Sequence, residues 1–495
     1  MLTRTLISGA RLGPSTPPQD VVVDEGRVTA IGNVNASPGF EDVVIVNGRL
    51  VLPALWDHHV HFDQWAQVSK RIDLSTVGSA AAAARVVADQ VIGRERGAAT
   101  IVGYGFRDAL WPDAPHRDIL DEAVAEPPAV LISADLHSAW LNTSALRRFG
   151  APEHPTGLLR EAEAMRVIDE VADSTDDVGD AWAADAARAA AARGVVGIVD
   201  MERPWPLAAW RRRMAAGNRS LRVVSSVWPE RFEELVGQGL RSGDIIDGPG
   251  GLLTVGPLKV IIDGSLNTRT AYCRDPYPES SASSDGFGLL LIPPSDLTQL
   301  MRQASDAGLA CAIHAIGDHA NTVALDAFSR TGAHGSIEHA QLLDDADVRR
   351  FAEMPVVASV QPEHAMDDRD VAERYWAGRT RRAFVLRALL DAGAVLTLGS
   401  DAPVAPLDPW VTIAAATHRA RDGRDRWHPE QEITVSEALA ASMPLGQRSQ
   451  TIRVGDAADL IVLDGDPFTA TPGALRQMGV AATMLAGSWT HRTDL

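Results

Sequence analysis

The stretch LPALWDHHVH, residues 52–61, reads as an apolar strand that ends in a cluster of histidines. Helical stretches separate most of the later strands, and the clearest is the alanine-rich run DAWAADAARAAAARG at 180–194, which Gly194 closes. The later segments with strand-like composition are 195–200, 221–228, 253–263, 309–316, 335–341, 355–361 and 394–401. With 52–61 these make eight alternating strand–helix units, which predict an α/β fold with a TIM-type (β/α)8 barrel.

The two ends of the chain predict a second, all-β region. Short alternating strands with turn residues occupy the first fifty residues, and similar strands recur in the last fifty. We therefore expect a small β-sandwich built from residues 1–53 plus 448–495, with the barrel at 54–447. More than a hundred residues separate the first barrel strand from the second and contain strand signals of their own (ATIVGYGF, AVLISAD). We expect an inserted subdomain there, at about 65–185.

The charge and the residue composition exclude some classes of binding partner. The formal net charge of -19 argues against nucleic acid and against an anionic membrane, because both are bound by basic patches. There is no run of about eighteen apolar residues, so we expect no membrane span. The first residues lack an apolar segment with a cleavage signal, and two cysteines make no disulfide framework. We expect a cytoplasmic protein that forms a homodimer.

Ligand-capable side chains close several of the predicted strands. His59 and His61 are two residues apart, so in an extended chain both imidazoles point to one face, while His58 points to the other. The residues that end later strands are His314, His339 and Asp401. Each alone is explained as well by a buried histidine with a partner or by a loop-capping aspartate. Together they predict a metal site, because the carboxyl ends of barrel strands meet at one rim.

Lysine use adds a further signal. Only Lys70 and Lys259 are lysine among the 46 basic residues, and Lys259 stands inside an apolar strand. A desolvated lysine has a lowered pKa and can be a neutral amine. A neutral primary amine adds carbon dioxide to form a carbamate, an anionic ligand with two oxygens that can bridge two cations. The alternative is a lysine that reaches solvent or pairs with Asp263.

The sequence resembles the metal-dependent amidohydrolase superfamily, and within it amidohydrolase family 3 and the YtcJ-like branch that includes N-substituted formamide deformylases. The matching segments follow the family order over nearly the whole chain: LPALWDHHVHF, LHSAWLNTSAL, TGLLRE, LKVIIDGSLNTRTA, CAIHAIGDHANTVALDAF, SIEHAQ, SVQPEH, LGSDAPV and GDAADLIVLDGDP. A single His-x-His motif is weak evidence, whereas this ordered set is specific.

The resemblance implies a centre with two divalent metal ions. One ion would be held by His59, His61 and Asp401 and the other by His314 and His339. Carbamylated Lys259 and a hydroxide would bridge them. Zinc suits imidazole and carboxylate ligands, and manganese or iron stays open.

The expected reaction is hydrolysis of a C–N bond in a small amide, formamide or cyclic amide. A hydroxide generated by the metals would attack, and Asp401 would act as general base and then as general acid. Two alternatives are open: the same site could act on a lactone or ester or could deaminate a ring, or the chain could be a non-catalytic scaffold.

Further residues are candidates for the pocket by motif position or by their placement in loops. The candidates for substrate binding are Trp65, Trp111, His137, Arg269 and His364. Ordinary packing explains the tryptophans equally well. Asp57 precedes the histidine pair, and we expect it to orient that pair by hydrogen bonding.

Overall fold

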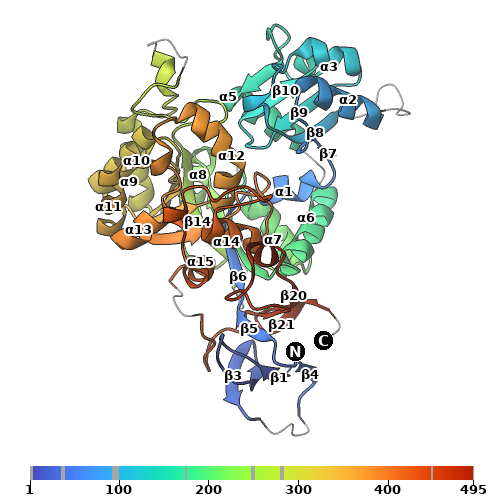
Figure 1. Cartoon of the computed structure of the whole chain (residues 1–495), viewed down its shortest axis with the longest axis vertical. Helices are drawn as coiled ribbons and strands as arrows, with labels where there is room; N and C mark the ends of the chain where they lie inside the picture. The colour runs from blue at the N-terminus through green and yellow to red at the C-terminus, as the bar shows by residue number, and fades with distance from the viewer. Residues whose placement is uncertain are drawn as a thin grey trace.

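The protein is described from a computed structural model, shown in Figure 1. The structure describes residues 4–34, 39–91, 100–172, 176–203, 205–246, 251–278, 284–446, 450–493 and 495. Three bodies are visible in Figure 1: a barrel in the centre, a lobe at the upper right, and two sheets at the lower end that contain both chain termini.

The central body is a barrel of eight parallel strands in the order β18-β17-β16-β15-β14-β13-β12-β6. The strands are β6 Leu55–Val60, β12 Val195–Asp200, β13 Arg222–Val227, β14 Leu253–Ile261, β15 Cys311–Ala315, β16 Gly335–His339, β17 Val356–Val360 and β18 Val395–Leu398. All eight predicted strands are present. They are almost continuous apolar runs, as expected for strands that are buried on both faces.

The barrel closes between its first and last strands. Val60 forms a parallel bridge with Ala402. The backbone N–H of Asp401 donates to the carbonyl of His59 at 2.7 Å, and the N–H of His61 donates to the carbonyl of Ala402 at 2.7 Å. The first and last ligand-bearing segments of the chain are therefore neighbours at this seam.

Helices cover the outside of the barrel. They are α1 Phe62–Val68, α6 Asp176–Ala191, α7 Leu207–Ala215, α8 Pro229–Gly237, α9 Pro294–Asp306, α10 Asp318–Thr331, α11 Asp345–Glu353, α12 Pro362–Tyr375, α13 Leu386–Ala392, α14 Pro409–His418, α15 Val435–Ala441 and α16 Pro472–Arg476. The predicted alanine-rich helix is α6. Its buried alanines, among them Ala183, Ala187 and Ala190, share one apolar core with the barrel strands. Small side chains on this face let the helix pack closely on the sheet.

The lobe lies between the first and second barrel strands in sequence. It holds a five-stranded sheet in the order β11-β10-β9-β8-β7. Its strands are β7 Ile72–Asp73, β8 Ile101–Phe106, β9 Ala129–Ser133, β10 Ser138–Leu141 and β11 Leu158–Arg160, and its helices are α2 Ala80–Val91, α3 Arg117–Ala123, α4 Thr143–Arg148 and α5 Glu161–Ala172. Both strand signals noted in the sequence form strands here. The predicted limits of the insertion, residues 65 and 185, stay a prediction.

The two terminal sheets each have four strands, in the orders β3-β2-β1-β4 and β21-β20-β19-β5. Their strands are β1 Thr5–Ala10, β2 Gln19–Asp24, β3 Arg27–Gly32, β4 Asp42–Ile45, β5 Leu50–Pro53, β19 Leu460–Leu463, β20 Val480–Leu485 and β21 Ser488–Arg492. Side chains of both sheets, such as Val21 and Met484, share one apolar cluster. The predicted domain limit at residue 448 lies outside the described residues, and the domain division stays a prediction.

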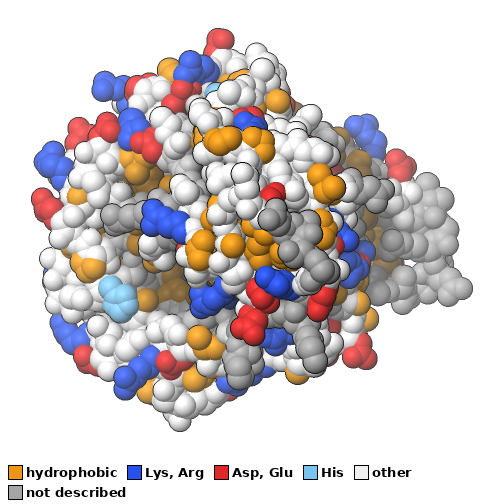
Figure 2. Space-filling view, turned by 90° about the horizontal axis from the view of Figure 1, so that it is seen from below, with side chains coloured by type: hydrophobic (Ala, Val, Ile, Leu, Met, Phe, Trp, Pro, Cys, Tyr) orange, Lys and Arg blue, Asp and Glu red, His pale blue; other side chains and the backbone are white. Residues whose placement is uncertain are grey.

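The surface carries charges of both signs. On the face shown in Figure 2, Lys and Arg side chains lie among Asp and Glu side chains, with hydrophobic groups between them. In the described part of the chain, no helix has both the length and the apolar character needed to cross a membrane.

Candidate active site

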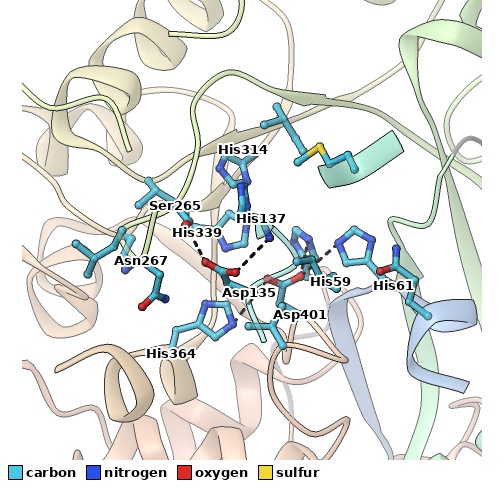
Figure 3. A pocket seen from close by; sticks show the side chains of 18 of the residues that line it. His59, His61, Asp135, His137, Ser265, Asn267, His314, His339, His364 and Asp401 are labelled. Carbon is cyan, nitrogen blue, oxygen red and sulfur yellow. Dashed lines mark hydrogen bonds and ion pairs between the residues drawn. The ribbon is translucent and has the colours of Figure 1, made fainter. Parts of the chain in front are cut away.

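One pocket at the carboxyl ends of the barrel strands contains all six predicted metal-ligating residues, as Figure 3 shows in part. They are His59, His61, Lys259, His314, His339 and Asp401. The pocket encloses about 910 Å³, open solvent at its mouth included. Its remaining walls come from the lobe and from the loops that follow the strands, so the site lies where lobe and barrel meet.

Three of the predicted ligands converge, and a fourth, His314, packs against one of them. Ligand atoms of His59, His339 and Asp401 all lie within 4.8 Å of one another. The ring centroids of His314 and His339 are 4.5 Å apart, and those of His59 and His339 are 5.1 Å apart. The resemblance assigned His59 and Asp401 to one ion and His339 to the other. In the structure these three side chains lie together, as expected if the two ions share one compact centre.

Strand alternation explains the first histidines. His59 Nε2 lies 3.5 Å from Asp401 Oδ1, and His61 Nε2 lies 3.4 Å from the same oxygen. His58, between them, points away and its Nε2 hydrogen-bonds the carbonyl of Met443 at 2.8 Å. As predicted, His58 therefore takes no part in the pocket.

The backbone turns sharply at two of the ligands. His339 has φ +74° and Asp401 has φ +57°, a left-handed conformation that non-glycine residues seldom adopt. Both residues stand where a barrel strand ends. Such unfavourable backbone conformations concentrate at functional sites, where the surrounding structure holds them in place.

Burial favours the uncharged form of four of the predicted nitrogen ligands. Burial, with the nearby Lys259, lowers the pKa of His59. Burial places the pKa of His314 and of His339 well below the ordinary value. The Lys259 side chain is also buried, and this lowers the pKa of its amine despite the nearby carboxylates of Glu338 and Asp401. Neutral imidazoles and a neutral amine are the forms that bind cations.

Asp401 has the opposite character. Burial works against its charge, but the neighbouring His59 and the hydrogen bond with His61 outweigh this effect and hold its pKa well below the ordinary value. The same hydrogen bond, working against burial, raises the pKa of His61. The site therefore presents an anionic oxygen beside the ring nitrogens of His59, His61 and His339.

The unpartnered polar atoms fit a bound cation. Six buried nitrogens around the pocket have no hydrogen-bond partner among the described residues. They are His59 Nε2, His61 Nδ1, Lys259 Nζ, His314 Nε2, His339 Nδ1 and His364 Nε2. Buried polar groups are nearly always paired, so a cluster of this size needs an occupant, and imidazole and amine nitrogens suit a divalent cation.

Two carboxylates hold His59 from behind. Asp57 accepts hydrogen bonds from the backbone N–H of His59 at 3.1 Å and of Ser400 at 2.9 Å, as its predicted orienting role requires. Burial raises the pKa of Asp57 to about 7. Glu338, which the sequence analysis did not single out, lies 2.6 Å from His59 Nδ1.

Glu338 could have been found by the signal that identified Lys259, a charged residue inside an apolar strand. Its carboxylate also accepts a hydrogen bond from Ser336. Burial opposes its charge, but His59 lowers its pKa to about 2. A carboxylate behind a metal-binding imidazole fixes the ring and makes it a better ligand.

Two of the five predicted substrate-binding residues line the pocket. His364 Nε2 lies 3.7 Å from Asp401 Oδ2, and His137 Nδ1 lies 2.7 Å from Glu161. Burial disfavours the charge of His137, but Glu161 outweighs it and raises the pKa of His137 to about 9.

The other three, Trp65, Trp111 and Arg269, are not among the described residues that line the pocket. Trp65 packs against Phe62 with ring centroids 5.8 Å apart, and Trp111 packs against Phe106 at 5.7 Å. Arg269 lies over the ring of Tyr375 at 5.4 Å. The two tryptophans therefore have the ordinary packing role that the sequence left open as an alternative to substrate binding.

The rest of the pocket wall could not be read from the sequence. An apolar strip is formed by Met165 and Ile168 of α5 with Trp228 and Ile261 of the barrel. Charged residues at the rim include Arg107, Asp135, Asp169 and Arg203. Several come from the lobe and reach the site only because the lobe folds over the barrel rim.

A parallel barrel with imidazoles, a carboxylate and a buried lysine at one rim is the architecture of metal-dependent hydrolases. The amidohydrolase family model matches residues 43–491, and the chain belongs to this family.

Named relatives agree with this assignment. The chain is 25% identical to the putative amidohydrolase YtcJ of Bacillus subtilis, with 94% of each chain covered. It is 26% identical to the N-substituted formamide deformylase of Arthrobacter pascens, with 95% of this chain and 94% of the relative covered. The crystal structure of an uncharacterized metal-dependent hydrolase from Pyrococcus horikoshii superposes with a TM-score of 0.78 at 26% identity, over 95% of this chain and 99% of that one. The predicted resemblance is thereby confirmed.

Proposed function

We propose that this hydrolase cleaves a C–N bond in a small amide, formamide or cyclic amide. The observation that carries the proposal is the group of unpartnered buried nitrogens on side chains that line one pocket together with the carboxylate of Asp401. The relative from Arthrobacter pascens is named for deformylation of N-substituted formamides, which supports the same class of bond.

We further propose two divalent ions as cofactor, with zinc first and manganese or iron as alternatives. His59, His61 and Asp401 would hold one ion and His314 with His339 the other, with carbamylated Lys259 between them. Such ions lower the pKa of a bound water and polarise a carbonyl group.

The chain's own groups account for proton movement. Asp401 lies within 3.7 Å of both His61 Nε2 and His364 Nε2, so its carboxylate stands at the centre of the polar wall. As an anion it can accept the proton of the attacking water and deliver it to the leaving nitrogen. Glu338 and Asp57 keep the His59 ring and backbone in place during this transfer.

The pocket suits a small molecule with an apolar portion. Met165, Ile168, Trp228 and Ile261 offer an apolar strip on one side. Arg203 at the rim is held by Glu230 at 2.6 Å and lies over Trp228 at 4.7 Å. The β-sandwich from both termini, the homodimer and the cytoplasmic location stay predictions from the sequence.

The test is a hydrolysis screen with metal-loaded protein. N-formyl, N-acyl and cyclic amides are compared with matched esters, lactones and aminated rings, and the products are identified. Release of an amine and an acid supports the proposal. Release of an alcohol would instead support the ester or lactone alternative, and release of ammonia alone would support the deaminase alternative. A fully metal-loaded, folded protein that turns over none of these would contradict it.

A further inference from the structure

We propose that His137, supplied by the lobe, is a catalytic residue that donates a hydrogen bond to the acyl oxygen of the substrate, and that Glu161 is the positioning residue that fixes its ring. This inference rests on the proposed amide hydrolysis and extends it to residues outside the metal-binding set.

The lobe delivers His137 to the rim of the barrel. His137 directly precedes β10 and lines the pocket, as Figure 3 shows. Its ring centroid lies 5.9 Å from that of His314. Its backbone N–H donates to Asp135 at 3.2 Å, and Asp135 accepts a hydrogen bond from Ser265 of the barrel at 2.9 Å. The lobe loop is thus anchored to the barrel next to the residue it presents.

Glu161 determines which ring nitrogen faces the pocket. It lies 2.7 Å from His137 Nδ1 and also accepts from the hydroxyl groups of Thr268 and Thr270. A carboxylate can only accept, so Nδ1 is the donor in this pair. Nε2 is therefore the nitrogen available to a molecule in the pocket. Because an acyl oxygen is an acceptor, the proposed role requires a proton on Nε2 as well, and the buried carboxylate of Glu161 would balance the resulting charge.

The chain makes room for this carboxylate. Glu161 begins α5 with φ +48°, a conformation that turns its side chain toward the loop after β14. A Cβ atom on Gly264 in that loop would lie 2.0 Å from Thr270 Oγ1 and 2.7 Å from Glu161 Oε1. Only glycine fits there. The loop that follows Lys259 is therefore shaped around the Glu161 carboxylate.

The acyl oxygen is the group that fits this donor. Asp401, the proposed proton carrier, lies beside His59 and His61. His137 lies beside His314, which we assign to the ion that polarises the carbonyl. A donor on this side stabilises negative charge that develops on the oxygen, and loss of one such donor lowers kcat by about 10² to 10³.

The test compares His137→Gln, Glu161→Gln and the matched control Glu163→Gln, an exposed residue of the same helix. Metal content is measured by elemental analysis. With the best amide from the screen, we expect His137→Gln to lower kcat by about 100-fold with little change in KM. We expect Glu161→Gln to lower kcat by about 10-fold to 100-fold, because the ring is misplaced, and Glu163→Gln to stay within about twofold.

Two readouts are independent of turnover. The Nδ1 proton signal of His137 in NMR spectra, assigned by its loss in His137→Gln, should vanish or shift in Glu161→Gln but not in Glu163→Gln. Acetate, whose carboxylate resembles the acyl end, should bind zinc-loaded His137→Gln about tenfold more weakly than wild type, as measured by calorimetry.

Unchanged kcat in folded His137→Gln would overturn the proposal, and so would loss of metal, which would make His137 a ligand. If His137→Gln does not fold, His137→Asn is given the same measurements. If wild type hydrolyses no amide, the proposed function has failed, and acetate binding decides this inference: tenfold weakening supports it, and equal binding overturns it.

Discussion

Replacement of Lys259 by methionine separates the role of this residue in folding from its role in metal binding. Lys259 is 1% exposed, and its Nζ has no hydrogen-bond partner among the described residues. Burial lowers its pKa although Glu338 and Asp401 pull the other way, so desolvation exceeds the attraction of the carboxylates. At a pH below the pKa that the Lys259 amine has in the unfolded chain, its charge therefore opposes folding. Each unit by which burial lowers this pKa corresponds to about 1.4 kcal/mol of lost stability.

We expect metal-free Lys259→Met to be more stable than metal-free wild type. Without the buried amine the variant avoids the desolvation cost that lowers the pKa of Lys259, so we expect a gain of about 1–2 kcal/mol. The free energy of unfolding would be measured in urea after removal of metal by a chelator. Lys70→Met is the matched control, because Lys70 is the other lysine of the chain and is exposed. A metal-free Lys259→Met variant less stable than this control would refute the reasoning.

The metal-loaded proteins should behave in the opposite way. Lys259→Met and Lys259→Arg should lose at least one metal equivalent and the activity, because neither side chain forms a carbamate, while Lys70→Met should keep both. Growth with ¹³C-labelled bicarbonate should add a carbamate signal that Lys259→Met lacks. Short carboxylic acids should partly restore Lys259→Ala. Unchanged metal stoichiometry in Lys259→Arg would contradict the ligand role.

Three other predictions test the rest of the site. Asp401→Asn should abolish turnover with metal retained or reduced, as measured by single-turnover assays and elemental analysis; measurable wild-type rates would exclude its role in proton transfer. Glu338→Gln should weaken metal binding by about 10-fold to 100-fold in a chelator competition, because the ring of His59 is released, whereas Glu437→Gln, a helix cap far along the chain, should not. The raised pKa of His137, about 9, contributes stability below pH 6.5 that is lost as the pH rises through 9. Wild type should therefore lose roughly 3 kcal/mol of unfolding free energy in this window, and Glu161→Gln should lose much less; equal loss would show that this pair is not responsible.

The barrel was predictable because its strands are long apolar runs separated by helices, and because each ends in a polar residue. Strand periodicity also predicted correctly that His58 faces away from His59 and His61. These signals are local, and each depends only on residues that are close in the chain.

The rest of the pocket depends on contacts between distant segments. Nothing near Glu161 in the sequence indicates that Thr268 and Thr270 would donate to it from the barrel. Glu338 was missed because its partner is His59, 279 residues earlier. Trp111 was considered for the pocket from its loop placement, yet its ring packs inside the lobe against Phe106.

The seam between β6 and β18 sets an order of events during synthesis. His59 is synthesised 342 residues before Asp401, its neighbour across the seam. During most of translation, the nascent chain therefore contains His59 and His61 but not yet Asp401. The predicted ligand set is therefore complete only after the last barrel strand has been made, so a metal that needs the whole set would bind after translation of the barrel.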